Sequence, residues 1–324
     1  MDTESGARAV GELMGEIVDR LGAAGIEHPA ADAELLLGHV LGVSRGRVQA
    51  LAITGSLASA EQAEAALDLA DERARRVPLQ HLTGRAPFRG IELSVGPGVF
   101  VPRPETEGVA QFAIDALAAV PDPSPLAVDL CTGSGAIALS LAREVPTARV
   151  WAVERSREAH AWAERNVTAL GDGRVSLVLG DVRDLDPNAA ESSVVVAEEA
   201  ERRPRSSSRG GTRALQDVFA PLRGRVHVLV SNPPYVPDAM VPRDPEVRDH
   251  DPALALYGGP DGLDLVRVIS RVGLELVAPG GAIVLEHAET QGAAIRALLA
   301  ADGWRAPATH PDLTMRDRAT TALR

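Results

Sequence analysis

An asparagine, two prolines and a tyrosine stand together at residues 232–235, directly after the apolar run VHVLVS. Two prolines beside an asparagine end a strand well, so a plain turn is one interpretation. The other interpretation is chemical. The side-chain oxygen of Asn232 and the backbone carbonyl of Pro233 can accept hydrogen bonds from an amino group, and Tyr235 can supply an apolar wall. Because proline lacks an N–H and has a fixed φ, the direction of that carbonyl would be set in advance.

A glycine-containing loop follows another apolar run, LAVDL at 126–130. Glycines at such a place let the backbone turn tightly and approach a ligand closely at the start of a helix. The loop lacks a third glycine and a P-loop lysine, so it is not built to bind a di- or triphosphate. The candidate ligand-binding residues here are Thr132, Gly133, Ser134, Gly135 and Ala136.

Two carboxylates follow the next two apolar runs. Glu154 lies about twenty residues beyond the glycine loop, the offset at which an acidic residue binds ribose hydroxyls in nucleoside-binding sheets. Asp181, followed by Val182, ends the run RVSLVLG, where its carboxylate could accept a hydrogen bond from an adenine amino group. A helix N-cap is the alternative for Asp181. Adenosine without phosphates, on this kind of sheet, points to S-adenosylmethionine.

The elements that must position these residues alternate between strand and helix from about residue 105. Strands are predicted at 126–130, 148–153, 174–180, 226–231 and 282–286, with helical stretches at 135–144, 157–170 and 262–277. This alternation predicts an α/β fold, a doubly wound and mostly parallel sheet with helices on both faces. Ligands bind beyond the carboxyl ends of the strands in that architecture, which is where the candidate residues stand.

The N-terminal part of the chain has a helical pattern instead. Apolar residues repeat at helical spacing over 10–21 and 35–41, and Ser59 with Gln62 predicts the capping box of a third helix. Residues 86–102 then alternate and carry turn glycines, which predicts a β-hairpin. The predicted domains are a small all-helical N-terminal domain at 1–84, a β-hairpin linker at 85–104 and a catalytic domain at 105–324.

Composition excludes several classes of protein. The formal net charge of −12 counts against a broad nucleic-acid surface. No uncharged apolar run reaches the roughly 18 residues of a membrane helix, and the acidic, polar N-terminus is not that of a secretory signal. The single cysteine, Cys131, fits a reducing compartment and is interpreted as a packed thiol. We expect a cytoplasmic protein without a membrane partner, and no metal site, because the eight histidines lack metal-ligand spacing.

With these residues in view, the chain resembles the class I S-adenosylmethionine-dependent methyltransferases, and closely the HemK/PrmC family. Those enzymes methylate the side-chain nitrogen of the glutamine in the Gly-Gly-Gln motif of peptide chain release factors. The resemblance covers nearly the whole chain and implies a seven-stranded methyltransferase sheet. The segments that carry it are RVPLQHLTG at 76–84, FVPRPETE at 100–107, the glycine loop, residues 232–235, DPAL at 251–254 and GGPDG at 258–262.

The resemblance also implies roles for matching residues. Residues 132–136, Glu154, Asp181, Val182 and Asn232 would line the cofactor site. The substrate glutamine would be held by Asn232, Pro233, Pro234 and Tyr235, with Phe100 opposite, and the catalytic residues would be Asn232, Pro233 and Tyr235. A primary amide is a poor nucleophile, so two hydrogen bonds that aim its nitrogen at the methyl group would supply the main catalytic effect, orientation. Carbonyl dipoles would oppose the positive charge that develops on nitrogen, and no dedicated general base is expected.

The chain departs from the family between the third and fourth predicted strands. An insertion near 187–215 is rich in arginine, serine and glycine, which predicts a disordered surface loop. Contact of its arginines with ribosomal RNA is the alternative. Ala288 stands where the family usually has glycine. The helical N-terminal domain would help to dock the release factor, or it would simply stabilise the catalytic domain.

Three hypotheses for function follow. The first is a monomeric release factor glutamine methyltransferase. The second is a related amino-group methyltransferase that acts on a ribosomal-protein glutamine or on adenine in nucleic acid, although the acidic charge counts against nucleic acid. The third is a non-catalytic S-adenosylmethionine-binding protein, which would have no need of the residues at 232–235.

Overall fold

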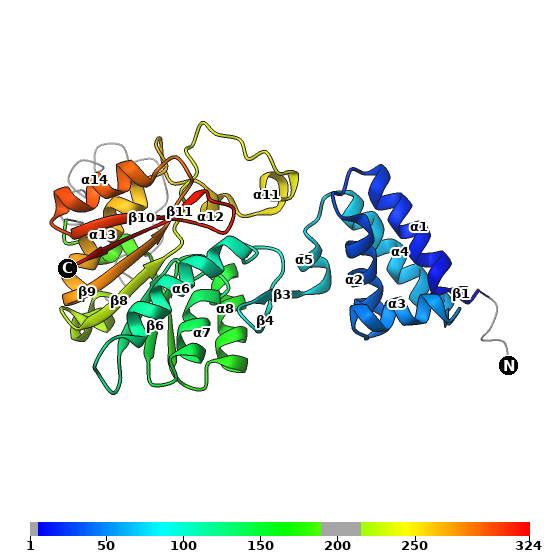
Figure 1. Cartoon of the computed structure of the whole chain (residues 1–324), viewed down its shortest axis with the longest axis horizontal. Coiled ribbons are helices and arrows are strands. Elements are labelled where there is room, and N and C mark those ends of the chain that lie inside the picture. Colours follow the sequence, from blue (N-terminus) through cyan, green and yellow to red (C-terminus); the bar gives the residue numbers. More distant parts are fainter. Residues whose placement is uncertain (1–5, 189–214) are drawn as a thin grey trace, which may run out of the picture. The chain divides into compact units, whose positions relative to one another are not determined.

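The computed structural model describes residues 6–188 and 215–324, which form two compact units (Figure 1). The first unit consists of the chain up to Arg85 with Val95–Pro97 and Pro242–Asp251, and the second of Ala86–Ser94, Gly98–Val241 and Pro252–Arg324. The insertion near 187–215 falls almost entirely on residues outside those described, so its disorder stays a prediction, as do the predicted domain boundaries.

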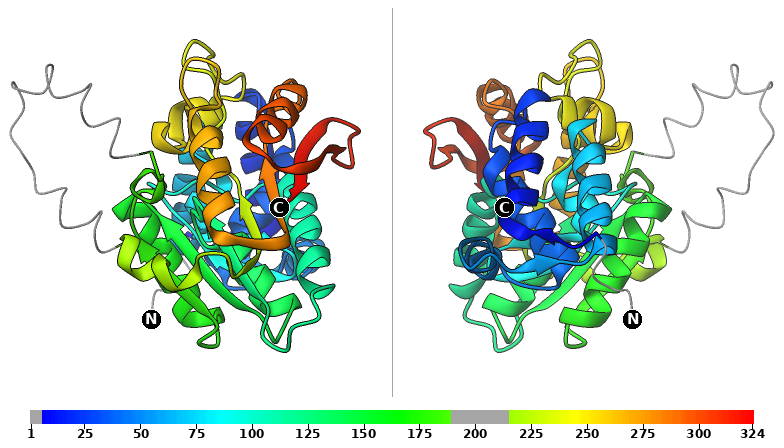
Figure 2. Two further views of the ribbon diagram at one scale, coloured as in Figure 1. Left: turned by 90° about the vertical axis from the view of Figure 1, so that its left-hand side faces the viewer. Right: turned by 90° about the vertical axis from the view of Figure 1, so that its right-hand side faces the viewer.

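The first unit is a bundle of helices (Figure 2). Its elements are β1 (Arg8–Ala9), α1 (Val10–Ala23), α2 (Pro29–Leu41), α3 (Arg45–Ile53), β2 (Leu57–Ala58), α4 (Ala60–Ala74) and α5 (Leu79–Thr83). Leu13, Ile17 and Leu36 are fully buried in its core. The predicted capping box exists: Gln62 N donates to Ser59 Oγ at 3.1 Å, and Ser59 N donates to Gln62 Oε1 at 2.9 Å. It begins the fourth helix rather than the third, because α3 had not been predicted.

The segment Pro242–Asp251, which follows the sheet strand that ends before residues 232–235, also belongs to the first unit. Helix α11 (Pro245–His250) carries Glu246, whose side chain is 12% exposed. Glu246 accepts from Arg73 Nη1 at 2.7 Å and from Arg76 Nη2 at 2.7 Å. Arg73 also donates to Asp32 at 2.7 Å, so a largely buried ion network holds this segment on the helices.

The predicted hairpin is present as β3 (Arg85–Phe88) and β4 (Ile91–Ser94). Its two-residue turn places both Arg89 (φ +44°) and Gly90 (φ +72°) in the left-handed region, the backbone that the tightest hairpin turns require. On α8 (Arg157–Leu170), Asn166 pairs with the backbone of Ser94 at 2.7 and 3.0 Å. The same amide donates to the carbonyl of Ser134 at 2.9 Å, so the hairpin and the glycine loop share one anchor.

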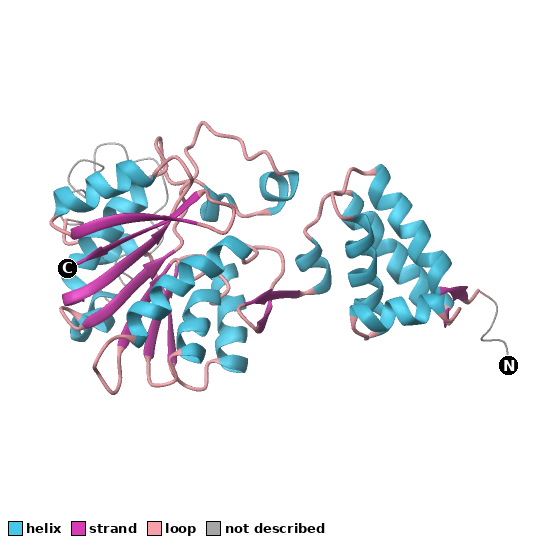
Figure 3. Ribbon diagram, in the orientation of Figure 1, coloured by secondary structure: helices cyan, strands magenta, loops and turns pink. Residues whose placement is uncertain are grey.

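The second unit contains the predicted seven-stranded sheet, with the spatial order β10-β11-β9-β8-β5-β6-β7 (Figure 3). Its strands are β5 (Leu126–Leu130), β6 (Arg149–Glu154), β7 (Val175–Leu179), β8 (Val226–Ser231), β9 (Val277–Glu286), β10 (Arg305–Pro311) and β11 (Asp317–Leu323). Neighbours from β7 to β9 are parallel, whereas β11 pairs antiparallel with both β9 and β10. The predicted doubly wound, mostly parallel fold is therefore confirmed.

Helices cover both faces of this sheet (Figure 3). One face carries α6 (Pro104–Ala118), α7 (Ala136–Glu144) and α8, and the other carries α13 (Asp264–Leu276) and α14 (Gly292–Asp302). Short elements lie in the connections: η1 (Val182–Leu185), η2 (Ala220–Leu222) and α12 (Ala253–Leu256). The core beneath α13 is mostly aliphatic, and Leu229, Ile269 and Ile283 in it are fully buried. Such close packing holds the strands rigidly, so their carboxyl ends form a fixed platform.

Candidate active site

The glycine loop leaves β5 and enters α7 through two left-handed glycines. Gly133 has φ +58° and Gly135 has φ +86°, a backbone that residues with a side chain rarely adopt. A Cβ on Gly133 would meet no heavy atom within 4 Å, so one side of the loop is open to a ligand. Ala136 is the first residue of α7, and Thr132 N donates to the carbonyl of Val153 on the neighbouring strand at 3.0 Å.

Asp129, a residue that sequence reasoning did not select, fixes this loop by accepting two hydrogen bonds. It is fully buried at the end of β5, and its Oδ2 accepts from Thr132 Oγ1 at 2.6 Å and from Ala138 N at 3.1 Å. Its Oδ1 has no hydrogen-bond partner among the described residues. Burial raises the pKa of Asp129 to about 7, against the effect of these hydrogen bonds. The carboxyl group ties the strand, the loop and the helix together.

Glu154 lies at the end of β6 and contacts the same loop. Its Oε2 accepts from Gly133 N at 2.9 Å, and its Oε1 accepts from Ser156 N at 2.7 Å. The residue is only 8% exposed, and burial raises its pKa despite those backbone bonds. A carboxylate offers about four acceptor positions, so Glu154 retains capacity for hydroxyl donors after fixing the loop.

Asp181 follows β7 and caps the short helix η1. Its Oδ1 accepts from Arg183 N at 3.0 Å, and its Oδ2 pairs with Arg155 Nε at 3.0 Å. The N-cap alternative for Asp181 is therefore realised, and Val182 behind it is buried. A contact of Asp181 or Val182 with adenine stays a prediction.

The tetrad Asn232-Pro233-Pro234-Tyr235 begins where β8 ends, directly beside the glycine loop. Strands β5 and β8 pair in parallel with Leu130 opposite Ser231, and Ser231 Oγ donates to the carbonyl of Leu130 at 2.6 Å. Two segments about a hundred positions apart in the chain thus leave adjacent strands at the same edge of the sheet. The arrangement brings the Asn232 amide at a strand end next to the glycine loop.

Gly258, Gly262 and Gln291 contact the backbone carbonyls of the tetrad. A Cβ on Gly258 would lie 2.3 Å from the carbonyl oxygen of Pro234, and one on Gly262 would lie 2.1 Å from that of Tyr235. Only glycine permits such an approach, which explains the spacing of GGPDG. Gln291, just before α14, donates from Nε2 to the carbonyl of Tyr235 at 2.9 Å. The backbone of the tetrad is therefore held on several sides.

One further polar contact reaches the tetrad from α6, and a buried carboxyl group lies at the end of β9; sequence reasoning selected neither residue. Asn232 Nδ2 donates to Thr106 Oγ1 at 3.4 Å. Glu286, at the end of β9, is 1% exposed, and its Oε2 has no hydrogen-bond partner among the described residues. Burial raises the pKa of Glu286 to about 7. The signal for Thr106 was its place in PRPETE, a segment noted for its resemblance but given no chemical role.

Two other residues considered in the sequence analysis are Phe100 and Cys131, and the third point is the expected absence of a metal site. Phe100 lies in the loop before α6, where the guanidinium of Arg103 stands 4.9 Å from its ring centre, and its contact with substrate stays a prediction. Cys131 packs against the core, and burial raises the pKa of its thiol, which agrees with a packed rather than nucleophilic cysteine. The described residues contain no group of three or more histidine, cysteine and acidic side chains able to bind a metal.

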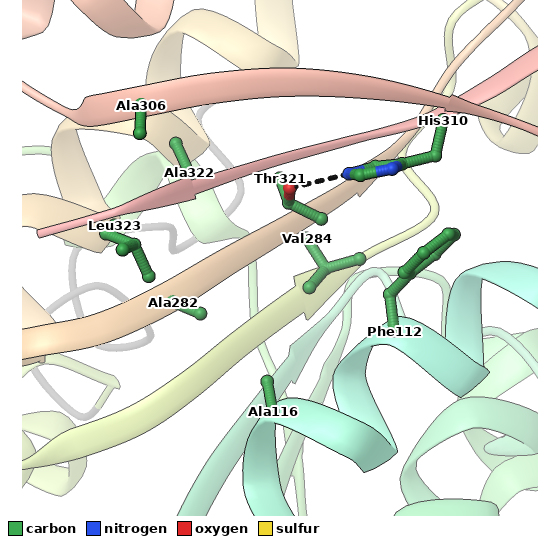
Figure 4. A pocket seen from close by; sticks show the side chains of 9 residues that line it. All are labelled: Phe112, Ala116, Ala282, Val284, Ala306, His310, Thr321, Ala322 and Leu323. Atoms are coloured by element: carbon green, nitrogen blue, oxygen red, sulfur yellow. Dashed lines mark hydrogen bonds between the residues drawn. The ribbon is translucent and has the colours of Figure 1, made fainter. Parts of the chain in front are cut away.

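A separate cavity of about 320 Å³ lies between α6 and the strands β9, β10 and β11 (Figure 4). Phe112 stacks on His310 with ring centres 4.4 Å apart, and His310 Nε2 pairs with Thr321 Oγ1 at 2.8 Å. Its other lining residues are alanine, valine and leucine, so the cavity offers no group suited to methyl transfer.

This sheet order, with a glycine loop after its first strand and Asn-Pro-Pro-Tyr after its fourth, defines a methyltransferase. The family models agree, since one described as a methyltransferase domain matches residues 127–221 and one described as the PrmC N-terminal domain matches residues 12–84. The chain belongs to the release factor glutamine methyltransferase family.

Several relatives carry that family's name. The release factor glutamine methyltransferase of Streptomyces coelicolor is 43% identical, with 95% of each chain covered. That of Bifidobacterium longum is 40% identical over 96% of this chain and 98% of the relative. Among solved structures, a release factor-specific protein-(glutamine-N5) methyltransferase from Alicyclobacillus acidocaldarius is 25% identical with a TM-score of 0.38, over 71% of this chain and 98% of that one. In the part of the chain that the structure describes, no helix combines the length and apolarity needed to cross a bilayer.

Proposed function

We propose that this protein transfers a methyl group from S-adenosylmethionine to the side-chain amide nitrogen of the glutamine in the Gly-Gly-Gln motif of peptide chain release factors. Family membership supports the substrate, because relatives at 40–43% identity over nearly their whole length carry that name. The observation that carries the chemistry is the position of Asn232 beside the glycine loop, on paired strands. The reaction would take place in the cytoplasm, with the chain acting as a monomer.

The residues at the glycine loop fit the adenosine part of this cofactor. The loop has an open side at Gly133, and the Glu154 carboxylate fixed to it keeps acceptor positions for ribose hydroxyls. Thr132, Ser134, Gly135 and Ala136 would complete the loop contact, with Asp181 and Val182 at the adenine. When bound, S-adenosylmethionine supplies an electrophilic methyl group on sulfur.

The tetrad would bind and orient the glutamine. Asn232 Oδ1 and the Pro233 carbonyl would each accept one N–H of the substrate amide, which leaves the nitrogen lone pair aimed across the site. Pro234 and Tyr235 would form the wall of the glutamine pocket, with Phe100 opposite. Orientation of this kind accounts for a large part of a rate enhancement, because it replaces a search for the reactive geometry. The helical N-terminal domain would dock the body of the release factor.

A labelling experiment tests this function. The full chain is incubated with S-adenosylmethionine that carries a ¹³C,²H-labelled methyl group and with purified release factors, and the modified residue is mapped by peptide mass spectrometry. Label is expected on the glutamine of Gly-Gly-Gln alone. A release factor with that glutamine changed to asparagine is the matched control, because it keeps the amide but shortens its reach. Label on any other residue, or none, would contradict the proposal.

A further inference from the structure

The turn between β10 and β11 stands at the same edge of the sheet as the tetrad. Strand β11 runs antiparallel to β9, and Ala319 near its start pairs with Glu286 at the carboxyl end of β9. Strand β9 is in turn parallel to β8, after which the tetrad begins. Because β9 separates β8 from β11 and neighbouring strands are about 5 Å apart, the start of β11 lies about 10 Å from the end of β8. The turn at 312–316, in the second unit, therefore lies beside the candidate active site.

Two large apolar side chains of this turn are exposed. Leu313 is 104% exposed and Met315 is 80% exposed, and the hairpin that carries them, drawn in red, projects from the second unit (Figure 2). Single apolar residues on a surface are ordinary, but two large ones on one turn form a small apolar patch. Next to Met315, Arg316 pairs with Glu289 at 3.8 Å. An apolar centre with a charged rim is the composition of a protein-binding surface.

The turn is held in one shape by Asp312. Its Oδ1 accepts from Thr314 N at 2.8 Å, from Thr314 Oγ1 at 2.6 Å and from Arg316 N at 3.1 Å. Asp312 N donates to the carbonyl of Arg316 at 2.8 Å, and Asp312 Oδ2 pairs with Arg318 Nε at 3.5 Å. The side chain of Asp312 is only 8% exposed. A turn fixed in this way loses little conformational freedom when a partner binds to it.

The backbone at Met315 is that of a glycine position. Met315 has φ +65°, in the left-handed region that a residue with a side chain rarely adopts and that glycine adopts without strain. The exposed methionine side chain does not fill the core, so packing does not account for it. A strained residue that the core does not need is characteristic of functional sites.

We propose that Leu313 and Met315 form a docking surface for the protein substrate, on which apolar side chains beside the methylated glutamine of the release factor bind. This inference rests on the proposed function. About three residues of extended chain span about 10 Å, so the segment next to a glutamine held by the tetrad reaches the turn. A pocket for one side chain does not distinguish glutamines of different proteins, so selection of a release factor requires contacts with neighbouring residues.

Removal of the apolar patch tests the proposal by kinetics. In the double variant Leu313→Ser with Met315→Ser, the KM for the release factor is expected to rise about 10- to 100-fold, because the buried apolar contact is lost. Its kcat should stay within about threefold of the wild type, since binding distant from the reacting atoms is removed. The Kd for S-adenosylmethionine should stay within about twofold. An unchanged KM would overturn the proposal.

Two control variants accompany the serine variant. Leu313→Met with Met315→Leu keeps two large apolar side chains on the turn, and its KM should stay within about threefold of the wild type. Leu323→Ser removes a 44% exposed leucine at the other end of β11, and its KM should stay within about twofold. An equal rise of KM in Leu323→Ser and in the double serine variant would show a general effect of the hairpin and refute the docking role.

Met315→Gly separates docking from a structural role. Glycine relieves the left-handed backbone, so the Tm of this variant should not fall below that of the wild type. Its KM for the release factor should nevertheless rise about threefold to tenfold, because one of the two apolar side chains is lost. A lower Tm together with an unchanged KM would show that Met315 serves stability alone and would overturn the proposal.

The wild type distinguishes failure of this inference from failure of the proposed function. If it neither binds nor methylates release factors, the proposed function is wrong and the docking surface falls with it. If it methylates them and the double serine variant keeps the wild-type KM, the docking surface alone is refuted. Sedimentation tests a second copy of the chain as the occupant: a dimeric wild type and a monomeric double serine variant with equal KM would also refute substrate docking.

Discussion

The substitution Gly262→Ala tests whether the support behind the tetrad sets its reactivity. The new Cβ would lie 2.1 Å from the carbonyl oxygen of Tyr235 and 2.7 Å from Gln291 Nε2. To restore even 3.0 Å, the Tyr235 carbonyl must move by at least 0.9 Å, in a segment anchored by Gln291. Since a misplacement of about 1 Å can cost roughly 100-fold in rate, kcat is expected to fall by about that factor.

Gly280→Ala is the matched control for this substitution. Gly262 has φ +76° and Gly280 has φ +84°, so both variants force alanine into a left-handed backbone, but a Cβ on Gly280 meets nothing within 4 Å. Each should lose about 1–2 kcal/mol of stability from the backbone alone. This loss corresponds to a few degrees in Tm, measured by calorimetry. Methyl transfer by Gly280→Ala should stay within about twofold of the wild type.

The comparison of the two glycine variants is decisive in both directions. Initial rates are measured with saturating cofactor and release factor, and at a temperature well below both transitions. If Gly262→Ala keeps a kcat within threefold of the wild type, the tetrad tolerates displacement and the orientation argument is refuted. If Gly280→Ala loses as much activity as Gly262→Ala, general destabilisation explains both results.

Three further variants probe the site directly. Asn232→Ala should abolish detectable methyl transfer while cofactor binding, followed by calorimetry, weakens but persists; near-wild-type turnover would contradict the hydrogen-bonding role of Asn232. Glu154→Ala should raise the cofactor Kd about 10- to 100-fold, since hydrogen bonds to a charged group contribute about 1.5–3 kcal/mol, and an unchanged Kd would remove Glu154 from the cofactor site. Asp129→Asn should change how stability depends on pH. The pKa of Asp129 is raised to about 7 in the folded state and is near 4 when unfolded, so its contribution is full below pH 4 and is lost as the pH rises through 7. The Tm advantage of the wild type over Asp129→Asn should therefore shrink between pH 4 and 7, and a constant difference would show that Asp129 does not titrate there.

The strands that carry the site could be predicted because their sequences are locally unambiguous. LAVDL and VHVLVS are short apolar runs bounded by turn residues, and they are found at Leu126–Leu130 and Val226–Ser231. By contrast, α3 escaped prediction because Val48 is its only buried residue, so no apolar stripe marks it. Strands β10 and β11 at the edge of the sheet contain many polar or small residues, and nothing in their composition distinguishes them from loops.

Single carboxylates were harder to interpret than strands. Asp181 was offered as an adenine ligand or an N-cap, and its hydrogen bond to Arg183 N shows the cap, a role that only the backbone of η1 could reveal. Asp129 lies in the predicted strand LAVDL and was given no role, because its hydrogen bonds to Thr132 and Ala138 depend on the turn between β5 and α7. Local sequence gives the residue type at such a position, while the partner depends on the folded backbone.

The sequence by itself determined the alternation of strands and helices, the left-handed glycines of the loop and the tetrad at a strand end, since each depends on neighbours only a few positions away. The tertiary structure alone decided that Gly262 lies against the Tyr235 carbonyl and that Thr106 accepts a hydrogen bond from Asn232. These residues come from α6, from the segment that follows β8 and from the loop before α13, and only the packing of helices on the sheet brings them together. A hydrogen bond between residues 126 positions apart leaves no periodic trace in the chain, because its geometry is fixed by the packing of α6 on the sheet and not by local conformation.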